Sequence, residues 1–174
     1  MYRLKSLLGI ALLTSLFTGC TGIPKNVEPV SGFDLERYLG KWYEIARLDH
    51  SFERGLSRVT AEYTMREDGG VRVLNKGYSK TADEWDDAEG KAYFVEDATT
   101  GHLKVSFFGP FYASYVIAML DKENYQYAFI TGPDTSYLWL LARTPEVDET
   151  VRQAFMEFAQ SKGFASEELI WVEH

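Results

Sequence analysis

The strongest constraint on the fold is a series of short runs in which apolar and polar side chains alternate. In residues 58–65 the odd-numbered positions are apolar or aromatic and the even-numbered positions are polar. That period of two predicts a strand with one buried face. Asp68 and Gly69 follow, and this pair is a strong signal for a hairpin into the next run, residues 71–80. The chain is therefore expected to build antiparallel sheet.

Eight such runs are expected as strands. They lie around Trp42 and at residues 58–65, 71–80, 90–96, 103–108, 115–120, 125–131 and 137–143. Their number and spacing are typical of an all-β antiparallel barrel or sandwich. Helical periodicity occurs once, within residues 144–164. One amphipathic helix after eight strands is expected to pack outside the sheet, and residues 168–174 are expected to add a last short strand.

Composition narrows the class of protein. A length of 174 residues fits one domain, and an apolar fraction of 45% supports a folded core. The net charge of −8 lacks the basic surface that nucleic-acid binding requires, so no nucleic-acid partner is expected. The three histidines are scattered and the single cysteine lies near the start, so neither a metal site nor a thiolate site is predicted.

The first twenty residues read as an export signal rather than as part of the fold. Basic residues precede an apolar run, residues 7–17, which is about half the length needed to span a bilayer as a helix. Thr18-Gly19-Cys20 then places the lone cysteine where such a signal is cleaved. This end resembles a bacterial lipobox, although Phe17 stands where that motif usually has an aliphatic residue. An ordinary signal followed by a free cysteine is the alternative.

The lipobox resemblance implies that a signal peptide of residues 1–19 is removed and that the mature chain begins at an acylated Cys20. Several acyl chains on one protein anchor it stably, whereas a single chain binds only marginally. Thr21 stands in place of the aspartate that usually retains such lipoproteins in the inner membrane. The resemblance thus implies a lipid anchor in the outer membrane, with the protein facing the periplasm. Residues 20–32 contain two prolines and no periodicity and are expected to form a tether.

Three motifs after this tether carry a resemblance to a family. Gly40, Trp42 and Tyr43 form the stretch GKWYE, Asp121 stands in a turn before a later strand, and Arg143 ends the strand that precedes the helix. In this order they resemble the signatures of the lipocalin family, whose bacterial outer-membrane lipoproteins are the most similar and apolipoprotein D a more distant relative. The resemblance covers residues 33–171 and implies one lipocalin domain, residues 33–174. It also implies an eight-stranded antiparallel up-and-down barrel with the helix packed outside.

The resemblance also implies roles for individual residues. Trp42 and Arg143 would close the barrel floor by stacking, Gly40 would let the chain turn into the first strand, and Tyr43 would point outward toward the helix. Fatty acids or lysophospholipids would bind inside. The residues expected to contact them are Glu44, Ala61, Tyr63, Val73, Asn75, Phe107, Tyr115, Ile117, Ile130, Trp139 and Leu141, with Ala46, Phe94 and Val105 also facing inward.

Some expectations rest on single residues. Small inward residues such as Ala46, Gly77 and Gly90 favour a hollow barrel, and a cavity of several hundred cubic ångströms would fit a carrier whereas a filled interior would not. An inward Glu44 needs a partner or a raised pKa. It is expected either to hydrogen-bond to Tyr63, Tyr115 or Asn75, or to meet a polar head group. Arg47, Arg54 and Arg58 are expected as solvated charges at the mouth, with phosphate contact as the alternative, and the acidic residues 83–90 as a second mouth loop.

Other function classes find less support in the sequence. GxSxG, HExxH and a phosphate-binding glycine loop do not occur, and an enzymatic lipocalin that uses a thiol would need a cysteine inside the barrel. No catalytic residue and no cofactor are therefore predicted. A structural envelope lipoprotein with a filled barrel stays open as a second class. The sequence also leaves open whether the protein forms a homodimer.

Overall fold

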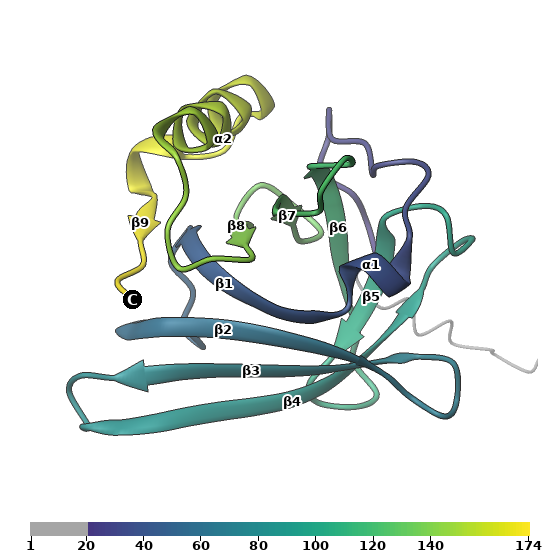
Figure 1. Ribbon diagram of the computed structural model, residues 1–174, viewed down its shortest axis with the longest axis horizontal. Coiled ribbons are helices and arrows are strands. Elements are labelled where there is room, and N and C mark those ends of the chain that lie inside the picture. The colour runs from purple at the N-terminus through teal and green to yellow at the C-terminus, as the bar shows by residue number, and fades with distance from the viewer. Residues whose placement is uncertain (1–20) are drawn as a thin grey trace, which may run out of the picture.

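The computed structural model describes residues 21–174 (Figure 1). The predicted signal peptide and Cys20 lie outside these residues. All eight expected strands form, and each pairs antiparallel with the next in the chain. They are β1 (Gly40–Arg47), β2 (Leu56–Met65), β3 (Val71–Ser79), β4 (Glu84–Phe94), β5 (His102–Ser106), β6 (Ala113–Leu120), β7 (Tyr127–Thr131) and β8 (Leu138–Ala142).

The first strand closes the barrel, because β1 pairs with β2 on one side and with β8 on the other. A short last strand, β9 (Ile170–Trp171), pairs with the far end of β1 outside the barrel. In an up-and-down barrel alternate connections lie at the same end. The connections β1–β2, β3–β4, β5–β6 and β7–β8 therefore share one end, which we call the mouth, and the other connections share the closed end. The prediction of an all-β barrel is confirmed.

Apolar side chains separate into two clusters on the two faces of the barrel wall. The inner cluster fills the barrel and includes Trp42, Tyr63 and Ile130, whereas the outer cluster lies between the wall and helix α2 (Glu149–Lys162). Phe155 of α2 is fully buried there, with its ring 5.0 Å from that of Phe129. The expected helix thus packs outside the barrel, as Figure 1 shows.

The longest strand, β4, differs from its prediction. It was expected at residues 90–96, with the acidic residues 83–90 in a loop, yet it begins at Glu84 and pairs with β3 from Glu84 to Ala92. Residues 84–89 are all exposed, so they show no apolar alternation from which a strand could be recognised. The β3–β4 hairpin is therefore tighter than expected, and its acidic side chains are held on a strand.

Residues 21–32, the described part of the proposed tether, lie along the barrel. Val27 is buried in the outer cluster. The N–H of Val30 donates to the carbonyl of Ile117 at 2.9 Å. The segment then reaches the closed end, where a one-turn helix α1 (Leu35–Tyr38) leads into β1. Across residues 21–174, no helix has the length and apolar character needed to cross a membrane.

Candidate ligand site inside the barrel

Trp42 and Arg143 seal the closed end as the resemblance implies. The Arg143 guanidinium carbon lies 3.9 Å from the centroid of the Trp42 ring, a distance at which cation and π-system attract. Arg143 also donates to the carbonyls of Arg37 and Lys41, at 2.7 and 3.0 Å. Gly40 starts the strand with φ of +94°, a conformation that glycine adopts without strain. One guanidinium therefore ties the end of β8 to α1 and to the start of β1.

Three tyrosines form a buried hydrogen-bonded chain above this floor. The Tyr115 hydroxyl lies 2.7 Å from that of Tyr38 and 2.8 Å from that of Tyr63. Burial raises the pKa of each phenol above its ordinary value, so all three are neutral near pH 7. The hydroxyls satisfy one another, which lets aromatic side chains fill the lower barrel without unpaired polar atoms.

The space that these tyrosines leave is small. It is a void of about 20 Å³, lined mainly by apolar side chains of α1 and strands β2 to β5. That is room for about one water molecule. Ligand pockets typically measure about 300–1,000 Å³. The closed half of the barrel is therefore filled in this conformation.

Two of the small inward residues that favoured a cavity, Gly77 and Gly90, are covered by large side chains. A Cβ added to Gly90 would lie 2.9 Å from the Phe107 ring, and one added to Gly77 would lie 2.9 Å from a Leu56 methyl. Large side chains from neighbouring strands thus cover both glycines. Small residues here permit close packing of their neighbours, which periodicity alone cannot distinguish from an empty lumen.

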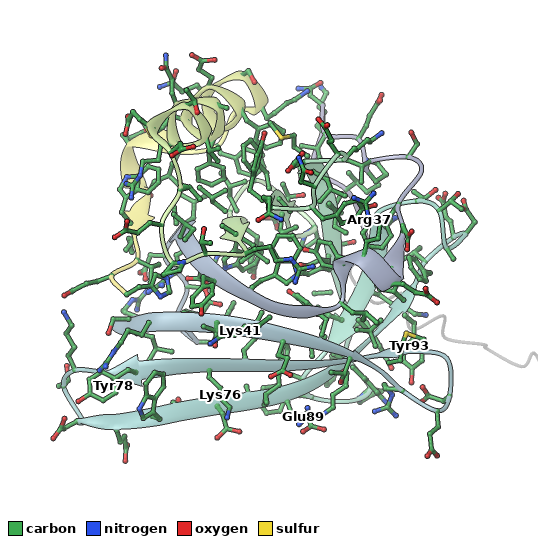
Figure 2. The ribbon with its side chains drawn as sticks, in the orientation of Figure 1. Arg37, Lys41, Lys76, Tyr78, Glu89 and Tyr93 are labelled. Atoms are coloured by element: carbon green, nitrogen blue, oxygen red, sulfur yellow. The ribbon has the colours of Figure 1, made fainter. Side chains whose placement is uncertain are left out.

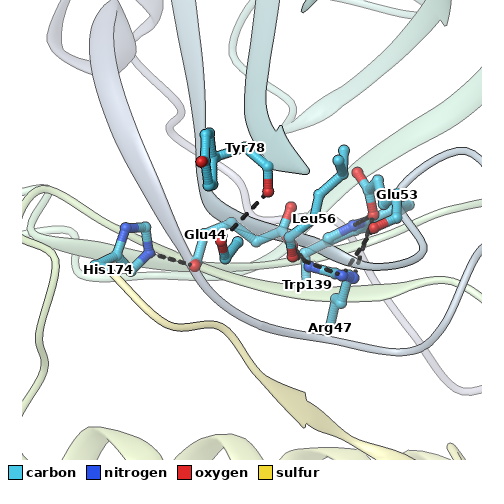
Figure 3. Close-up of polar contacts among 8 residues, drawn as sticks. Glu44, Arg47, Glu53, Leu56, Tyr78, Trp139 and His174 are labelled. Carbon is cyan, nitrogen blue, oxygen red and sulfur yellow. Dashed lines mark hydrogen bonds and ion pairs between the residues drawn. The ribbon is translucent and has the colours of Figure 1, made fainter. Parts of the chain in front are cut away.

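The mouth half contains a buried polar cluster of Glu44, Arg47, Glu53 and Trp139 (Figure 3). Arg47 is almost fully buried and donates to the Glu44 carboxylate at 2.7 Å. It also donates to the Glu53 carbonyl at 2.9 Å. The Trp139 indole N–H donates to the Glu53 carboxylate at 3.0 Å. Residues 48–55, the β1–β2 loop, are thereby held over the mouth by side chains from β1 and β8.

The two carboxyl groups share one guanidinium, and this arrangement determines their charge. Burial and, to a smaller extent, the charge of Glu53 raise the pKa of Glu44, Arg47 opposes the rise, and the resulting pKa is about 8. Burial also raises the pKa of Glu53, against the hydrogen bond from Trp139. Because one ionised carboxylate is enough to neutralise Arg47, the cluster keeps an extra proton at neutral pH. Ionising both groups would leave a buried negative charge without a partner.

This cluster corrects two expectations about β1. Arg47 was expected as a solvated charge and Ala46 as an inward residue, but the register of β1 against β8 shifts between Glu44 and Ala46. This irregularity reverses the alternation, so Ala46 packs in the outer cluster and Arg47 turns into the barrel. Glu44 is inward as expected. Its partner, however, is Arg47 rather than a tyrosine or Asn75.

The other residues expected at the ligand site lie on the inner face. The inner cluster contains or contacts Ala61, Tyr63, Val73, Phe107, Tyr115, Ile117, Ile130, Trp139 and Leu141, together with Phe94 and Val105. Asn75 shares the alternation of Val73, and its buried Oδ1 has no hydrogen-bond partner within the described chain. A buried polar atom of this kind usually binds water or a ligand. Contact with a ligand stays a prediction for each of these residues.

Three residues that the sequence analysis did not assign to the interior also belong to it. Glu53 reaches the barrel from the β1–β2 loop, Tyr38 from α1, and His50 stacks on Tyr137 at 4.3 Å between ring centroids. Loop residues carry no periodicity that would show which way they face. The helical turn Leu35–Tyr38 is too short for a hydrophobic stripe. Asp34, whose side chain accepts from the Arg37 N–H, is the one local residue type typical of such a helix start.

A larger hollow lies on the outer surface. It measures about 610 Å³ and is bordered by the outer faces of β1 to β4 and by the C-terminal His174. Figure 2 shows Lys41 and Lys76 along this face. Lysines, Arg58, aspartates and Trp85 are mixed in its lining, so its chemistry is less selective for an acyl chain than that of the inner face. Among residues 21–174, no three His, Cys, Asp or Glu side chains are grouped to hold a metal ion.

Comparison with known protein families identifies the family to which this barrel belongs. The lipocalin-like domain family matches residues 33–174. The chain belongs to the lipocalin family. Among curated relatives, it is 60% identical to the outer membrane lipoprotein Blc of Vibrio cholerae serotype O1 over 94% of the chain and 96% of the relative. It is 48% identical to the outer membrane lipoprotein Blc of Escherichia coli K12 over 98% of the chain and 97% of the relative.

More distant proteins are also similar to this chain. Apolipoprotein D of Mus musculus is 30% identical over 94% of the chain and 92% of the relative. The solved structure of insecticyanin from the tobacco hornworm Manduca sexta superposes with a TM-score of 0.68 at 20% identity, covering 88% of the chain and 87% of insecticyanin. The resemblance drawn from the sequence, including the bacterial outer-membrane lipoproteins and apolipoprotein D, is confirmed.

Proposed function

We propose that this lipocalin binds fatty acids or lysophospholipids inside its barrel and stores or transports them for maintenance of the outer membrane. Membership of the family and similarity to outer membrane lipoproteins support a binding protein rather than an enzyme. In this proposal Cys20 carries the lipid anchor, the protein faces the periplasm and no cofactor takes part. The names of the relatives likewise support attachment to the outer membrane.

One observation supports an amphiphilic ligand, namely the change in polarity along the inner face. The closed half is lined by side chains such as Val71, Val73 and Leu103. The mouth half presents the Glu44–Arg47–Glu53 cluster, and the unpartnered Asn75 oxygen lies on the same inner face. An acyl chain fits the first environment and a polar head group the second. Each buried methylene contributes ~0.8 kcal/mol, so a long chain offsets the cost of association only if most of it is enclosed.

Binding in this proposal requires the closed conformation to open. A void of about 20 Å³ does not accept an acyl chain, so inner side chains of the closed half must change rotamer. The same small void favours the second candidate function, a structural envelope lipoprotein with a permanently filled barrel. The two candidates differ in whether the protein ever encloses a ligand.

The test combines native mass spectrometry with variants at two tryptophans. Lipid that copurifies with the wild type is identified first, and binding of the same lipid is then titrated. We expect Trp139→Ala to weaken binding at least tenfold. Trp139→Phe, which keeps an aromatic ring but loses the N–H donated to Glu53, should weaken it less. Trp85→Ala is the matched control, because Trp85 lines the outer hollow.

The outcomes separate the candidates. Loss of affinity in the Trp139 variant alone supports a site inside the barrel. Loss in the Trp85 variant alone would move the ligand to the outer hollow and contradict the proposal. A protein that neither copurifies with lipid nor binds it on titration would favour the structural role.

A further inference from the structure

The most exposed apolar side chains of the described residues gather at the mouth. Phe108 is 82% exposed, Phe111 73% and Phe52 62%. Phe108 and Phe111 lie in residues 107–112, the β5–β6 loop, and Phe52 lies in the β1–β2 loop. At the closed end the corresponding exposed residue is Met65, where β2 ends. The mouth therefore exposes aromatic side chains that the closed end lacks among the described residues.

Phe108 and Phe111 do not belong to the ligand site, whereas Phe52 stacks on His50 with ring centroids 5.3 Å apart. Phe107 turns inward over Gly90, whereas the four residues that follow, 108–111, are all exposed. Their backbone closes on itself, because the Phe111 N–H donates to the Phe108 carbonyl at 3.1 Å. A turn that satisfies its own polar groups and points aromatic rings outward can enter an apolar surface at a low desolvation cost.

The point at which the described chain begins lies at the same end. Gly22 packs beside residues 132–137, the β7–β8 loop, and a Cβ added to it would lie 3.6 Å from the Pro133 carbonyl oxygen. Cys20 precedes Gly22 by two residues, so at most roughly 7 Å of extended chain separates the two. A lipid carried by Cys20 would therefore be attached within a short length of chain of the β7–β8 loop, which belongs to the mouth.

The charges of the mouth loops indicate whether an anionic or a zwitterionic lipid surface fits them. The four mouth loops contain two basic residues, Arg54 and Lys80, against the acidic residues Asp49, Glu53, Asp83 and Asp134. Arg54 already pairs with Asp49 and Lys80 with Glu173. No excess of positive charge is left to attract anionic lipids. The surface that fits is a zwitterionic one, which aromatic side chains enter at the headgroup level.

We propose that the mouth of the barrel docks on the bilayer that holds the lipid anchor, with Phe52, Phe108 and Phe111 in the interfacial layer. This surface rests on the proposed anchor at Cys20, but it does not depend on any ligand inside the barrel. It gives the aromatic loops a role separate from cargo binding. It also orients the barrel, with the mouth toward the lipids and the closed end away from them.

The experiment uses the full acylated protein on zwitterionic phosphatidylcholine vesicles, with an environment-sensitive fluorophore on single introduced cysteines. Cys20 is the only natural cysteine, and acylation occupies it, so each label is unique. Phe52→Cys and Phe108→Cys place the label at the mouth. Glu67→Cys places it in the exposed turn between β2 and β3 at the closed end and is the matched control.

We expect labels at positions 52 and 108 to shift to shorter wavelength on vesicles and to be quenched by brominated lipid, while a label at 67 stays unchanged. Replacing both Phe108 and Phe111 by serine should abolish the shift at 52. Met65→Ser, the same kind of change at the closed end, should leave it intact. Adding anionic lipid should not increase the shift.

Three results would overturn the proposal. The fluorophores at all positions could show neither a wavelength shift nor quenching by brominated lipid on vesicles that carry the protein. The shift could disappear on dilution of the protein at constant lipid, which would assign the aromatic loops to a second copy of the chain. Soluble lysophosphatidylcholine without vesicles could produce the full shift at 108, which would assign these loops to the cargo. If the barrel fails to bind cargo but the vesicle shift persists, only the proposed ligand function fails.

Discussion

Glu44 is the residue whose environment departs most from that of an ordinary surface carboxyl group. It lies inside the barrel, bonded to Arg47 and close to a second carboxyl group. Replacing a buried charge pair by one partner alone is usually far more costly than losing an exposed pair. Two consequences of this site can be measured, one by titration and one by deletion.

The first prediction concerns the pH dependence of stability. The pKa of Glu44 is raised from 4.5 to about 8 in the folded state, so the folded protein holds a proton that the unfolded chain releases. The free energy of unfolding therefore falls as the pH rises from 4.5 to about 8. We expect Glu44→Gln, which cannot ionise, to gain stability relative to the wild type over this range, as measured by denaturant unfolding.

The difference between variant and wild type cancels groups that titrate alike in both proteins and leaves the contribution of Glu44 together with its effect on Glu53. His50 and His102 titrate in part of the same range, and burial lowers the pKa of each, so they act in the opposite direction in both proteins. Glu62→Gln, on the exposed face of β2, is the control and should follow the wild type. A constant difference between Glu44→Gln and the wild type would show that Glu44 is ionised throughout.

The second prediction concerns Arg47. Its removal leaves two buried carboxyl groups without a cation and frees the carbonyls of Glu53 and Leu56, which it binds at 2.9 and 3.2 Å. We expect Arg47→Ala to cost about 3–5 kcal/mol in the free energy of unfolding. Arg54→Ala, which removes an exposed partner of Asp49, should have a far smaller effect. Equal losses in the two variants would mean that the buried cluster is not important for folding.

At the scale of elements, the strands were predictable where one face is buried and the other exposed. Residues 58–65 alternate cleanly, and β2 ends at Met65 as expected. The prediction failed where the pattern is absent or reversed. Residues 84–89 are exposed on both faces and are held as strand only by pairing with β3. The irregularity in β1 exchanges Ala46 and Arg47 between the two sides of the wall, and nothing in the local sequence marks it.

The residues of the inner site could likewise be predicted on the strands but not in the loops. Residues such as Val73 and Trp139 follow from strand alternation and from the family resemblance. Glu53 does not, because its direction is set by a loop that folds back onto Arg47 and Trp139. The close packing around Gly77 and Gly90 was not predictable either, since the side chains that cover them come from other segments of the chain.

The third prediction concerns helix α2, the element that covers the outer face. Phe155 is fully buried between the helix and the barrel wall, against Phe129. Phe155→Ala removes most of this contact and should cost about 3–5 kcal/mol in the free energy of unfolding. Gln160→Ala, on the exposed side of the same helix, should change it little. A small loss at Phe155 would mean that the barrel is stable without the helix.

For the molecule as a whole, the two ends of the barrel are closed by different chemistry. At the closed end Arg143 lies over Trp42 and binds backbone carbonyls, so its charge is matched by neutral groups that do not titrate. At the mouth the loop is held by Arg47 between Glu44 and Glu53. When both carboxyl groups are ionised, the single positive charge of Arg47 no longer neutralises them. A rise in pH should thus loosen the mouth while the closed end stays intact.

The last prediction links this difference to ligand entry. Lysophosphatidylcholine is a suitable probe, because its head group does not titrate in this range. We expect its association rate to increase as the pH rises through about 8, since ionisation of Glu44 beside Glu53 weakens the hold on the β1–β2 loop. Stopped-flow mixing on either side of that pH should show the increase in the wild type and in Glu62→Gln, but not in Glu44→Gln. A rate that rises equally in all three would locate the titrating group elsewhere and leave the mouth cluster with a purely structural role.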